Sequence, residues 1–367
     1  MKTKFTKEQH AIINASEEKI LVNASAGTGK TFTLIEAATK VIKEEEASEV
    51  AVFTLTRDAA QELQERFEIL PAFVGTIHAF ALTELRKMEE AKLLISEIMS
   101  DNKMKELLLN SYVQFYDIKK GYKEEVSDIF RYMTDRSYNP DIGTSSRYTK
   151  IINHYTKRKK EFNLYDYTDA PEYYFKKAKE LKYKPKYTHL YVDEVQDIDY
   201  WEYEIISNFK GRVFAIGDPK QNIYQFRNSI TSIFEKLEEI GYNIYILTKN
   251  FRSYQEILDC AGAVLKSTRG NGGYITNTSL FDVEDEIVVL CRYNHQVRNL
   301  TNYFDDVRTV HSYKGLEQDN VFVVDFAEDS EENENIMFVA KTRARNKLGI
   351  DTYDNTIRKG REIKYGL

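Results

Sequence analysis

The sequence is poor in proline and cysteine, and it contains no long apolar run. Only 5 prolines and 2 cysteines occur among its 367 residues. Cys260 and Cys291 are too few for a disulfide framework, so we expect reduced side chains in a cytosolic-type compartment. Residues 1–10 are polar and predict no signal peptide. No run approaches the ~20 apolar residues that cross a bilayer. These absences favour a cytoplasmic protein without a membrane segment.

A surplus of basic charge is lacking as well. The formal net charge is −6, from 52 Lys and Arg against 58 Asp and Glu. Proteins that passively coat nucleic acids usually carry a basic surplus, so this balance disfavours that class. It does not exclude a motor on nucleic acid, because one basic track on an acidic body is sufficient.

The hydrophobic pattern alternates between short apolar runs and helical stretches. The runs, each typical of a buried strand, are 20–23, 50–54, 189–193, 213–216, 242–247, 287–291 and 321–326. Helical patterns at 31–42 and 58–67 follow the first two runs. This alternation predicts an α/β fold with parallel sheets covered on both faces. Strand signals vanish between residues 80 and 186, where Lys and Tyr are dense, so we expect a helical insertion there.

The clearest motif is a glycine-containing turn between an apolar run and a helical stretch, the context of a phosphate-binding loop. Its two glycines allow successive N–H groups to face phosphates. Lys30 is expected to reach the β- and γ-phosphates of ATP, and Thr31 to hold Mg²⁺. The alternative is a chance glycine turn before a helix. The phosphate loop comprises Ala24, Ser25, Ala26, Gly27, Thr28, Gly29, Lys30 and Thr31.

A second motif is an apolar run that ends in two acids, Asp193 and Glu194. In parallel α/β folds the carboxyl end of such a strand lies beside the phosphate loop. Asp193 is expected to bind Mg²⁺ through its water shell, and Glu194 to polarise the attacking water. Alone, the pattern is better explained as a solvated strand end. The presence of the phosphate loop reverses that preference.

Residues 192–197, Val-Asp-Glu-Val-Gln-Asp, resemble motif II of UvrD/Rep-like helicases of superfamily 1, and the phosphate loop resembles their motif I. Other segments resemble the family's remaining motifs in the family's order: the Q motif (5–9), Ia (54–60), Ib (75–80), III (217–227), IV (250–253), V (309–317) and VI (338–344). The resemblance covers nearly the whole chain. It implies two RecA-like motor domains that use ATP and Mg²⁺.

The resemblance also assigns roles to residues around the nucleotide. It implies that Gln9 reads the adenine edge, that Phe251 stacks on adenine and that Glu317 contacts the ribose. Gln221 is implied to sense the γ-phosphate. Arg252 and Arg343 are implied to be arginine fingers from the second domain, since a guanidinium offers paired donors to a transferring phosphoryl group. For either arginine alone, a surface salt bridge is an equal alternative.

Further positions match the family's nucleic-acid contacts. Phe226 lies where relatives stack an aromatic ring on a base, and Tyr224 is close to it in sequence. Stacking tolerates any base, as a stepping machine requires. Core packing is the alternative for Phe226. The remaining implied contacts with the strand are Thr56, Thr76, His78 and His311.

The implied domains are 1A (1–84 plus 186–245), a helical 1B (85–185) and 2A (246–367). Relatives insert an accessory domain, 2B, shortly before motif V. Here only a short stretch separates Asn294 from Thr309, so we expect 2B to be absent. The sequence also ends soon after motif VI, which leaves no room for a nuclease module.

The resemblance implies an ATP-dependent helicase or translocase that moves 3′→5′ on single-stranded DNA. Its expected partners are single-stranded and tailed duplex DNA, bound as a monomer, and an accessory protein. Replication and repair are the pathways of such relatives. The alternative is a DNA-stimulated ATPase switch within a larger replication, repair or defence complex. An RNA motor has no support beyond the shared engine.

Overall fold

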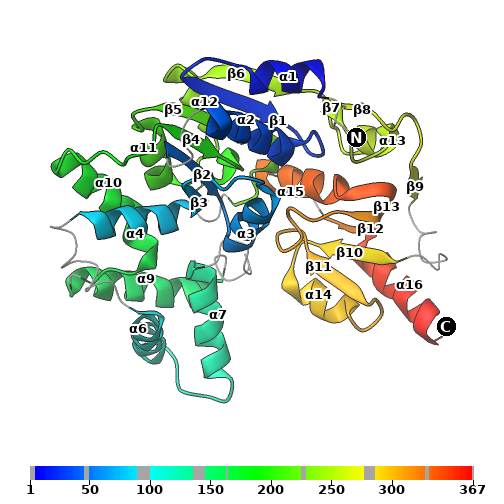
Figure 1. Cartoon of the computed structure of the whole chain (residues 1–367). Helices are drawn as coiled ribbons and strands as arrows, with labels where there is room; N and C mark the ends of the chain where they lie inside the picture. Colours follow the sequence, from blue (N-terminus) through cyan, green and yellow to red (C-terminus); the bar gives the residue numbers. More distant parts are fainter. Residues whose placement is uncertain are drawn as a thin grey trace.

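The computed structural model describes residues 5–44, 49–88, 100–134, 145–162, 164–224, 229–276, 286–326 and 330–365. Two parallel sheets lie side by side, and a group of helices extends from the first of them (Figure 1). This arrangement confirms the α/β class and the helical insertion that the sequence predicts.

The first sheet has six parallel strands in the order β3-β2-β4-β5-β1-β6. Every residue of β2 is buried, as expected for an inner strand that is covered on both faces. Separate apolar clusters pack on the two faces, with Leu21 in one and Val22 in the other. The strands are β1 (Lys19–Ala24), β2 (Val50–Thr54), β3 (Phe73–Thr76), β4 (His189–Val192), β5 (Arg212–Gly217) and β6 (Asn243–Leu247). The helices that accompany them are α1 (Lys7–Ile13), α2 (Lys30–Glu44), α3 (Arg57–Arg66), α4 (Ile77–Lys87), α11 (Tyr200–Ser207) and α12 (Ile233–Glu239).

The second sheet has five parallel strands in the order β11-β10-β12-β13-β9. The stretch between β10 and β11 holds one short helix, α14. The strands are β9 (Tyr274–Thr276), β10 (Ile287–Cys291), β11 (Asp306–Thr309), β12 (Gln318–Asp325) and β13 (Ala344–Thr352). The helices are α13 (Gln255–Cys260), α14 (Asn294–Leu300), α15 (Glu331–Lys341) and α16 (Tyr353–Tyr365). A small ribbon of β7 (Lys249–Asn250) and β8 (Lys266–Ser267) follows the first sheet in sequence.

The helical insertion has an apolar core of its own, built around Met104, Tyr112, Ile151 and Tyr155. Its helices are α6 (Asp101–Val113), α7 (Tyr122–Thr134) and α9 (Ser146–Glu161). The turn η3 (Tyr167–Asp169) leads into α10 (Ala170–Glu180), which packs on α4 and α11 and belongs to the core of the first sheet. The first sheet and its helices form the first lobe; the second sheet, its helices and the β7–β8 ribbon form the second lobe. Helix α10 therefore connects the insertion to the first lobe. Among the described residues, no helix is long and apolar enough to cross a membrane.

Candidate nucleotide and nucleic-acid site

The phosphate loop joins the end of β1 to the first residue of α2, as its sequence predicts. Gly27 and Gly29 have φ angles of +70° and +82°, a region that disfavours other residues. Close packing imposes a second requirement on Gly27. A Cβ atom at that position would lie 2.5 Å from Asn250 Nδ2 and 2.7 Å from Arg252 Cβ. The second lobe therefore rests directly on the loop.

Two carboxylates follow β4 beside this loop. Glu194 Oε1 lies 3.8 Å from Lys30 Nζ, and Gln196 Nε2 donates to Glu194 Oε2 at 2.5 Å. Glu194 adopts a left-handed backbone conformation (φ 52°, ψ 44°), which costs a non-glycine residue about 1–3 kcal/mol and is concentrated at functional sites. The strained turn holds the carboxylate against the phosphate-loop lysine.

The two acids differ in charge state. Burial, together with the negative charge of Glu194, raises the pKa of Asp193 to about 7. Burial also acts to raise the pKa of Glu194, but the positive charges of Lys30 and Lys314 outweigh it and hold this pKa at about 2. Glu194 is therefore an anion at neutral pH and can accept a proton. Asp193 is a buried carboxyl that lacks a full counter-charge, and a divalent cation would supply one.

Oxygen ligands of this kind suit Mg²⁺. The carboxyl of Asp193 and the hydroxyl of Thr31, the second residue of α2, are the oxygen donors that the sequence predicts. The raised pKa of Asp193 is the observation that fits them to a cation, since a bound cation would favour the ionised carboxylate.

The turn after β5 connects the loop with the acids. Asp218 Oδ2 accepts hydrogen bonds from Ser25 Oγ at 3.0 Å and from Gln221 Nε2 at 2.7 Å. The backbone N–H of Asp218 donates to Gln196 Oε1 at 3.0 Å. The structure thus brings Gln221, the predicted γ-phosphate sensor, into one network with the phosphate loop and the motif II segment.

Both predicted arginine fingers reach this cleft from the second lobe. Arg343 is 2% exposed, and its Nη2 donates to Gln221 Oε1 at 3.3 Å. Burial and the neighbouring charge of Arg252 lower the pKa of Arg343 to about 9, so it keeps its charge at neutral pH. Arg252 forms an ion pair with Glu317, the predicted ribose ligand.

The predicted adenine contacts flank the loop. A Cβ atom on Gly29 would lie 3.1 Å from Gln9 Nε2, and the ring of Phe251 is 45% exposed. The backbone N–H of Phe251 donates to the carbonyl of Gly27 at 2.8 Å. Asn250, to which the sequence gave no role, donates from Nδ2 to the carbonyl of Ala26 at 2.6 Å.

Lys314 is a second residue that sequence reasoning missed. Its Nζ donates to Asp197 Oδ2 at 2.5 Å and to the carbonyl of Gln221 at 2.7 Å. It also lies 4.8 Å from the centre of the Tyr224 ring. The position of Lys314 within motif V (309–317) was the sequence signal that could have identified it. Its contacts make a direct link between the second lobe and motifs II and III.

Thr56 and Thr76 lie at the N-termini of α3 and α4, where their hydroxyls accept from Ala59 N and Ala79 N, each at 3.2 Å. Beside them lies an open groove of about 660 Å³. Its lining consists of Arg57, Ala60, Gln61, Gln64, Glu65, Gly75, Thr76 and Ala79. Two helix N-termini at one groove favour the binding of phosphates.

Tyr167 of the helical insertion belongs to a segment that resembles one in relatives, but the sequence gave it no contact role; it reaches the same region. Its ring stacks on His78 with centroids 5.2 Å apart and an interplanar angle of 22°. Its hydroxyl lies 3.3 Å from Thr76 Oγ1, and the guanidinium carbon of Arg57 lies 5.6 Å from its ring centre. His78 Nδ1 also lies 3.4 Å from Glu202 Oε1. Tyr167 therefore joins two residues of the predicted track, Thr76 and His78, to Arg57 at the start of α3.

The remaining predicted track residues are placed differently. Tyr224 and His311 are 2% and 1% exposed, and their ring centres lie 6.0 Å apart. His311 Nε2 lies 3.0 Å from the carbonyl of Ile223, so the pair belongs to the interface between the lobes in this conformation. Phe226 falls in the stretch 225–228, outside the described residues.

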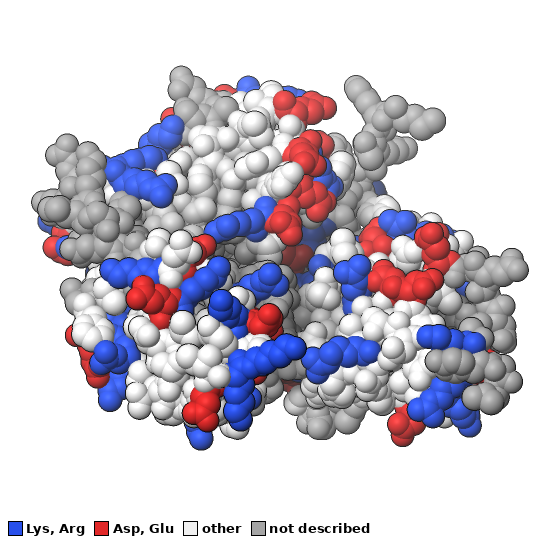
Figure 2. Space-filling view, turned by 90° about the horizontal axis from the view of Figure 1, so that it is seen from below, with Lys and Arg blue, Asp and Glu red and all other residues white. Residues whose placement is uncertain are grey.

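Basic and acidic side chains both border the hollow between the lobes. Seen from below, Lys and Arg lie on several sides of the hollow, whereas Asp and Glu gather at its upper edge and to its right (Figure 2). Basic side chains therefore line part of this hollow, although the chain as a whole carries a net charge of −6.

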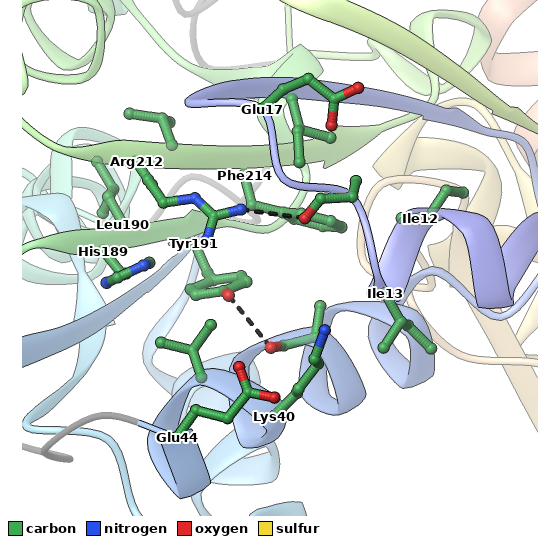
Figure 3. Close-up of a pocket in the computed structure, with 15 residues that line it drawn as sticks. Ile12, Ile13, Glu17, Lys40, Glu44, His189, Leu190, Tyr191, Arg212 and Phe214 are labelled. Carbon is green, nitrogen blue, oxygen red and sulfur yellow. Dashed lines mark hydrogen bonds between the residues drawn. The ribbon is translucent and has the colours of Figure 1, made fainter.

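A separate cavity of about 50 Å³ lies between the first sheet and helices α1 and α2 (Figure 3). Arg212 Nη2 donates there to the carbonyl of Ala15 at 3.0 Å, and the hydroxyl of Tyr191 donates to the carbonyl of Ala37 at 3.2 Å. Ligand pockets typically measure about 300–1,000 Å³, so this cavity is too small for a nucleotide. We interpret its polar contacts as structural.

Residues 5–240 match the UvrD/REP helicase N-terminal domain. Residues 143–352 also match the viral superfamily 1 RNA helicase core domain. The two matches overlap, and together they cover both lobes.

Individual proteins are similar too. A probable DNA helicase of Mycoplasma pneumoniae is 27% identical over 294 residues, which is 71% of this chain and 55% of that protein. A putative ATP-dependent DNA helicase of Bacillus subtilis, YjcD, is 26% identical over 295 residues, 71% of this chain and 38% of that protein. The Gabija protein GajB of Bacillus cereus is 28% identical over 269 residues, 68% of this chain and 47% of that protein.

The chain thus spans about half the length of the curated relatives it matches. The match to the N-terminal domain nevertheless covers well over half of this chain. It includes the phosphate loop, the two acids and Gln221, whose geometry forms one network. The chain belongs to the UvrD/REP helicase family.

Proposed function

We propose that this protein hydrolyses ATP to move 3′→5′ along single-stranded DNA. ATP with Mg²⁺ would bind between domain 1A (1–84 plus 186–245) and domain 2A (246–367). The observation that carries the proposal is the position of Gln221. It is bonded to Asp218 of the first lobe and to Arg343 of the second. One short turn therefore touches both the nucleotide cleft and the opposite lobe.

In the proposed reaction, Lys30 neutralises charge on the β- and γ-phosphates. Glu194 accepts a proton from the attacking water, whose oxygen forms a bond to the γ-phosphorus while the bond to the β–γ bridging oxygen breaks. Thr31 and Asp193 hold Mg²⁺, which would neutralise charge on the phosphates. ADP and inorganic phosphate are released.

Arg252 and Arg343 stabilise the charge that develops on the transferring group. Because both belong to the second lobe, their contact with the γ-phosphate would draw the lobes together. Lys314 passes this closure to motifs II and III through its bonds to Asp197 and Gln221. The Tyr224–His311 pair lies beside the same contact and couples closure to the strand.

The strand itself would lie along the groove beside Thr56, Thr76 and His78, with Phe226 as a stacking residue. The helical domain 1B (85–185) contributes Tyr167 and basic side chains. Single-stranded and tailed duplex DNA are the proposed partners, with one protein molecule on each strand. Only helix α14 stands between β10 and β11, so no internal 2B domain would grip the duplex ahead. We therefore expect unwinding of long duplexes to need an accessory protein.

A second candidate function is a DNA-stimulated ATPase switch within a larger complex. The similarity to a Gabija protein favours it. Such a switch would hydrolyse ATP on single-stranded DNA without displacing anything from the strand.

The test measures ATP turnover with and without single-stranded DNA, and then displacement of streptavidin from a biotinylated strand end. A 3′→5′ motor displaces streptavidin from the 5′ end and unwinds a long 3′-tailed duplex poorly under single-turnover conditions. Displacement only from the 3′ end would overturn the polarity. Stimulated turnover without displacement would favour the switch, and processive unwinding by the protein alone would show that 1B or 2A replaces an accessory domain.

A further inference from the structure

One carboxylate in the cleft holds two arginines. Glu317 Oε2 pairs with Arg252 Nε, and Glu317 Oε1 pairs with Arg345 through Nε at 2.9 Å and through Nη2. The three side chains differ in exposure: 17% for Arg252, 29% for Glu317 and 44% for Arg345. The buried arginine is the finger, and the outer arginine has no role in the scheme above.

The side chain of Arg269 links the backbones of the two arginines. Arg269 Nη1 donates to the carbonyl of Arg252 at 2.9 Å and to the carbonyl of Arg345 at 3.1 Å. Asp319 Oδ1 lies 3.8 Å from Arg345 Nη1 and is the weaker partner of that side chain. Glu317 is thus the main charge partner of Arg345.

We propose that Arg345 is a positioning residue that shares Glu317 with the finger and so frees Arg252 to move onto the γ-phosphate when ATP binds. The inference rests on the proposed ATP hydrolysis and deepens it. Arg252 pairs with Glu317, and Lys30 Nζ likewise lies 3.8 Å from Glu194 Oε1. When ATP binds, its phosphate oxygens replace these carboxylates as the partners of Arg252 and Lys30.

Two electrostatic effects act in the same direction. Arg345 repels Arg252, so it weakens the resting pair; correspondingly, burial lowers the pKa of Arg252 and the charge of Arg345 lowers it further, while Glu317 opposes both. After Arg252 leaves, Arg345 remains on Glu317, so that no half-buried carboxylate is left without a partner. Without Arg345, the finger would be held more tightly and its departure would cost more.

The test is Arg345→Ala in the full chain, read as kcat and KM for ATP. We expect kcat to fall about twofold to fivefold, which corresponds to the upper part of the range for a partly exposed ion pair, with KM changed by less than about twofold. Arg345→Lys keeps the charge and should restore most of the rate. Arg361→Ala on α16 and Asp319→Asn should each leave kcat unchanged.

The decisive measurement is a double-mutant cycle with Glu317→Gln, because a glutamine holds neither arginine by charge. In that background Arg345→Ala should change kcat by less than about twofold. An equal loss of kcat in both backgrounds would mean that Arg345 acts only through the fold, and would overturn the proposal. An unchanged kcat for Arg345→Ala alone would also overturn it while leaving the hydrolysis proposal intact. A wild-type protein without ATP turnover would overturn both.

Discussion

Sequence motifs outlined both the proposed ATP cleft and the proposed nucleic-acid face, yet the structure places the residues of the two sites differently. In the cleft, Lys30, Glu194 and Gln221 lie in one connected network with the second lobe. On the nucleic-acid face, Thr76 and His78 border a groove region with Tyr167, whereas Tyr224 and His311 are buried between the lobes.

The difference reflects what each site has to hold. A nucleotide cleft surrounds a small, charged molecule, so its residues must converge before the ligand arrives. A strand that slides needs a succession of weaker contacts, some of which form only in one conformation of the lobes. The first kind of site is visible in a single conformation, and the second kind is visible only in part.

The largest effect is expected from Lys30→Ala. Removal of the charge that neutralises the β- and γ-phosphates should reduce ATP turnover to background, with or without DNA. Lys40→Ala lies on the same helix and bonds only to the side chain of Asn14 among the contacts described, so it is the matched control. Residual DNA-stimulated turnover in the Lys30 variant would show that ATP hydrolysis does not depend on this lysine, contrary to the comparison above.

Glu194→Gln should follow in size. An amide cannot accept the proton of the attacking water, so hydrolysis should fall by about 10²–10⁴-fold. Binding of ATP, measured with a fluorescent analogue, should persist. Glu204→Gln, at a half-buried position of α11, provides a control. Hydrolysis at the normal rate by Glu194→Gln would show that another group acts as the base.

Asp193→Asn should change stability in a pH-dependent way. The folded-state pKa of Asp193, about 7, lies above its unfolded value of about 3.9. The stability that this raised pKa contributes is therefore fully present below about pH 4 and is lost as pH rises through about 7. Without nucleotide and Mg²⁺, the variant should be more stable than the wild type at pH 8, on the order of 2–4 kcal/mol, and the gap should shrink towards pH 5.

Urea unfolding at the two pH values measures this gap, with Asp354→Asn on α16 as an exposed-side control. Addition of Mg²⁺ and ATP should stabilise the wild type more than the variant, since the cation favours the ionised carboxylate. A gap that does not depend on pH would show that Asp193 is ionised in the empty cleft.

The smallest effect is expected on the nucleic-acid face. Tyr167→Ala should weaken single-stranded DNA binding by about 1–3 kcal/mol, the range of one stacked base, while basal ATP turnover survives. Tyr167→Phe keeps the ring and should lose little. Tyr200→Ala removes an exposed tyrosine from α11 and is the control. Loss of basal turnover and thermal stability together would instead assign Tyr167 to packing between α4 and the insertion.

Most strands of both sheets follow from the apolar runs. Residues 20–23, 50–54 and 213–216 lie within β1, β2 and β5, and the helical pattern at 31–42 lies within α2. The pattern did not reveal β3, β9, β11 or β13. Strands β3 and β9 are only four and three residues long, and in β13 the polar residues Arg345, Asn346 and Lys347 interrupt the apolar ones. Tertiary packing, rather than local hydrophobicity, makes these segments strands.

The sequence located the residues of the proposed cleft for a related reason. The phosphate loop is one contiguous segment and the two acids are another, and the local backbone shapes each through Gly27, Gly29 and the strained turn at Glu194. Lys314 and Asn250 were missed because each acts on residues far away in the chain. No local pattern marks a lysine that meets an aspartate 117 positions earlier.

The sequence by itself determined the chemistry of this protein: an α/β fold, a phosphate loop, a pair of acids and two arginines in the order of a known family. Only the tertiary structure decided which charges meet in the cleft, that Glu317 is shared by Arg252 and Arg345, and that Tyr167 joins His78. The reason is physical. Local motifs depend on backbone conformation within a few residues, whereas these contacts depend on how two lobes and an insertion dock.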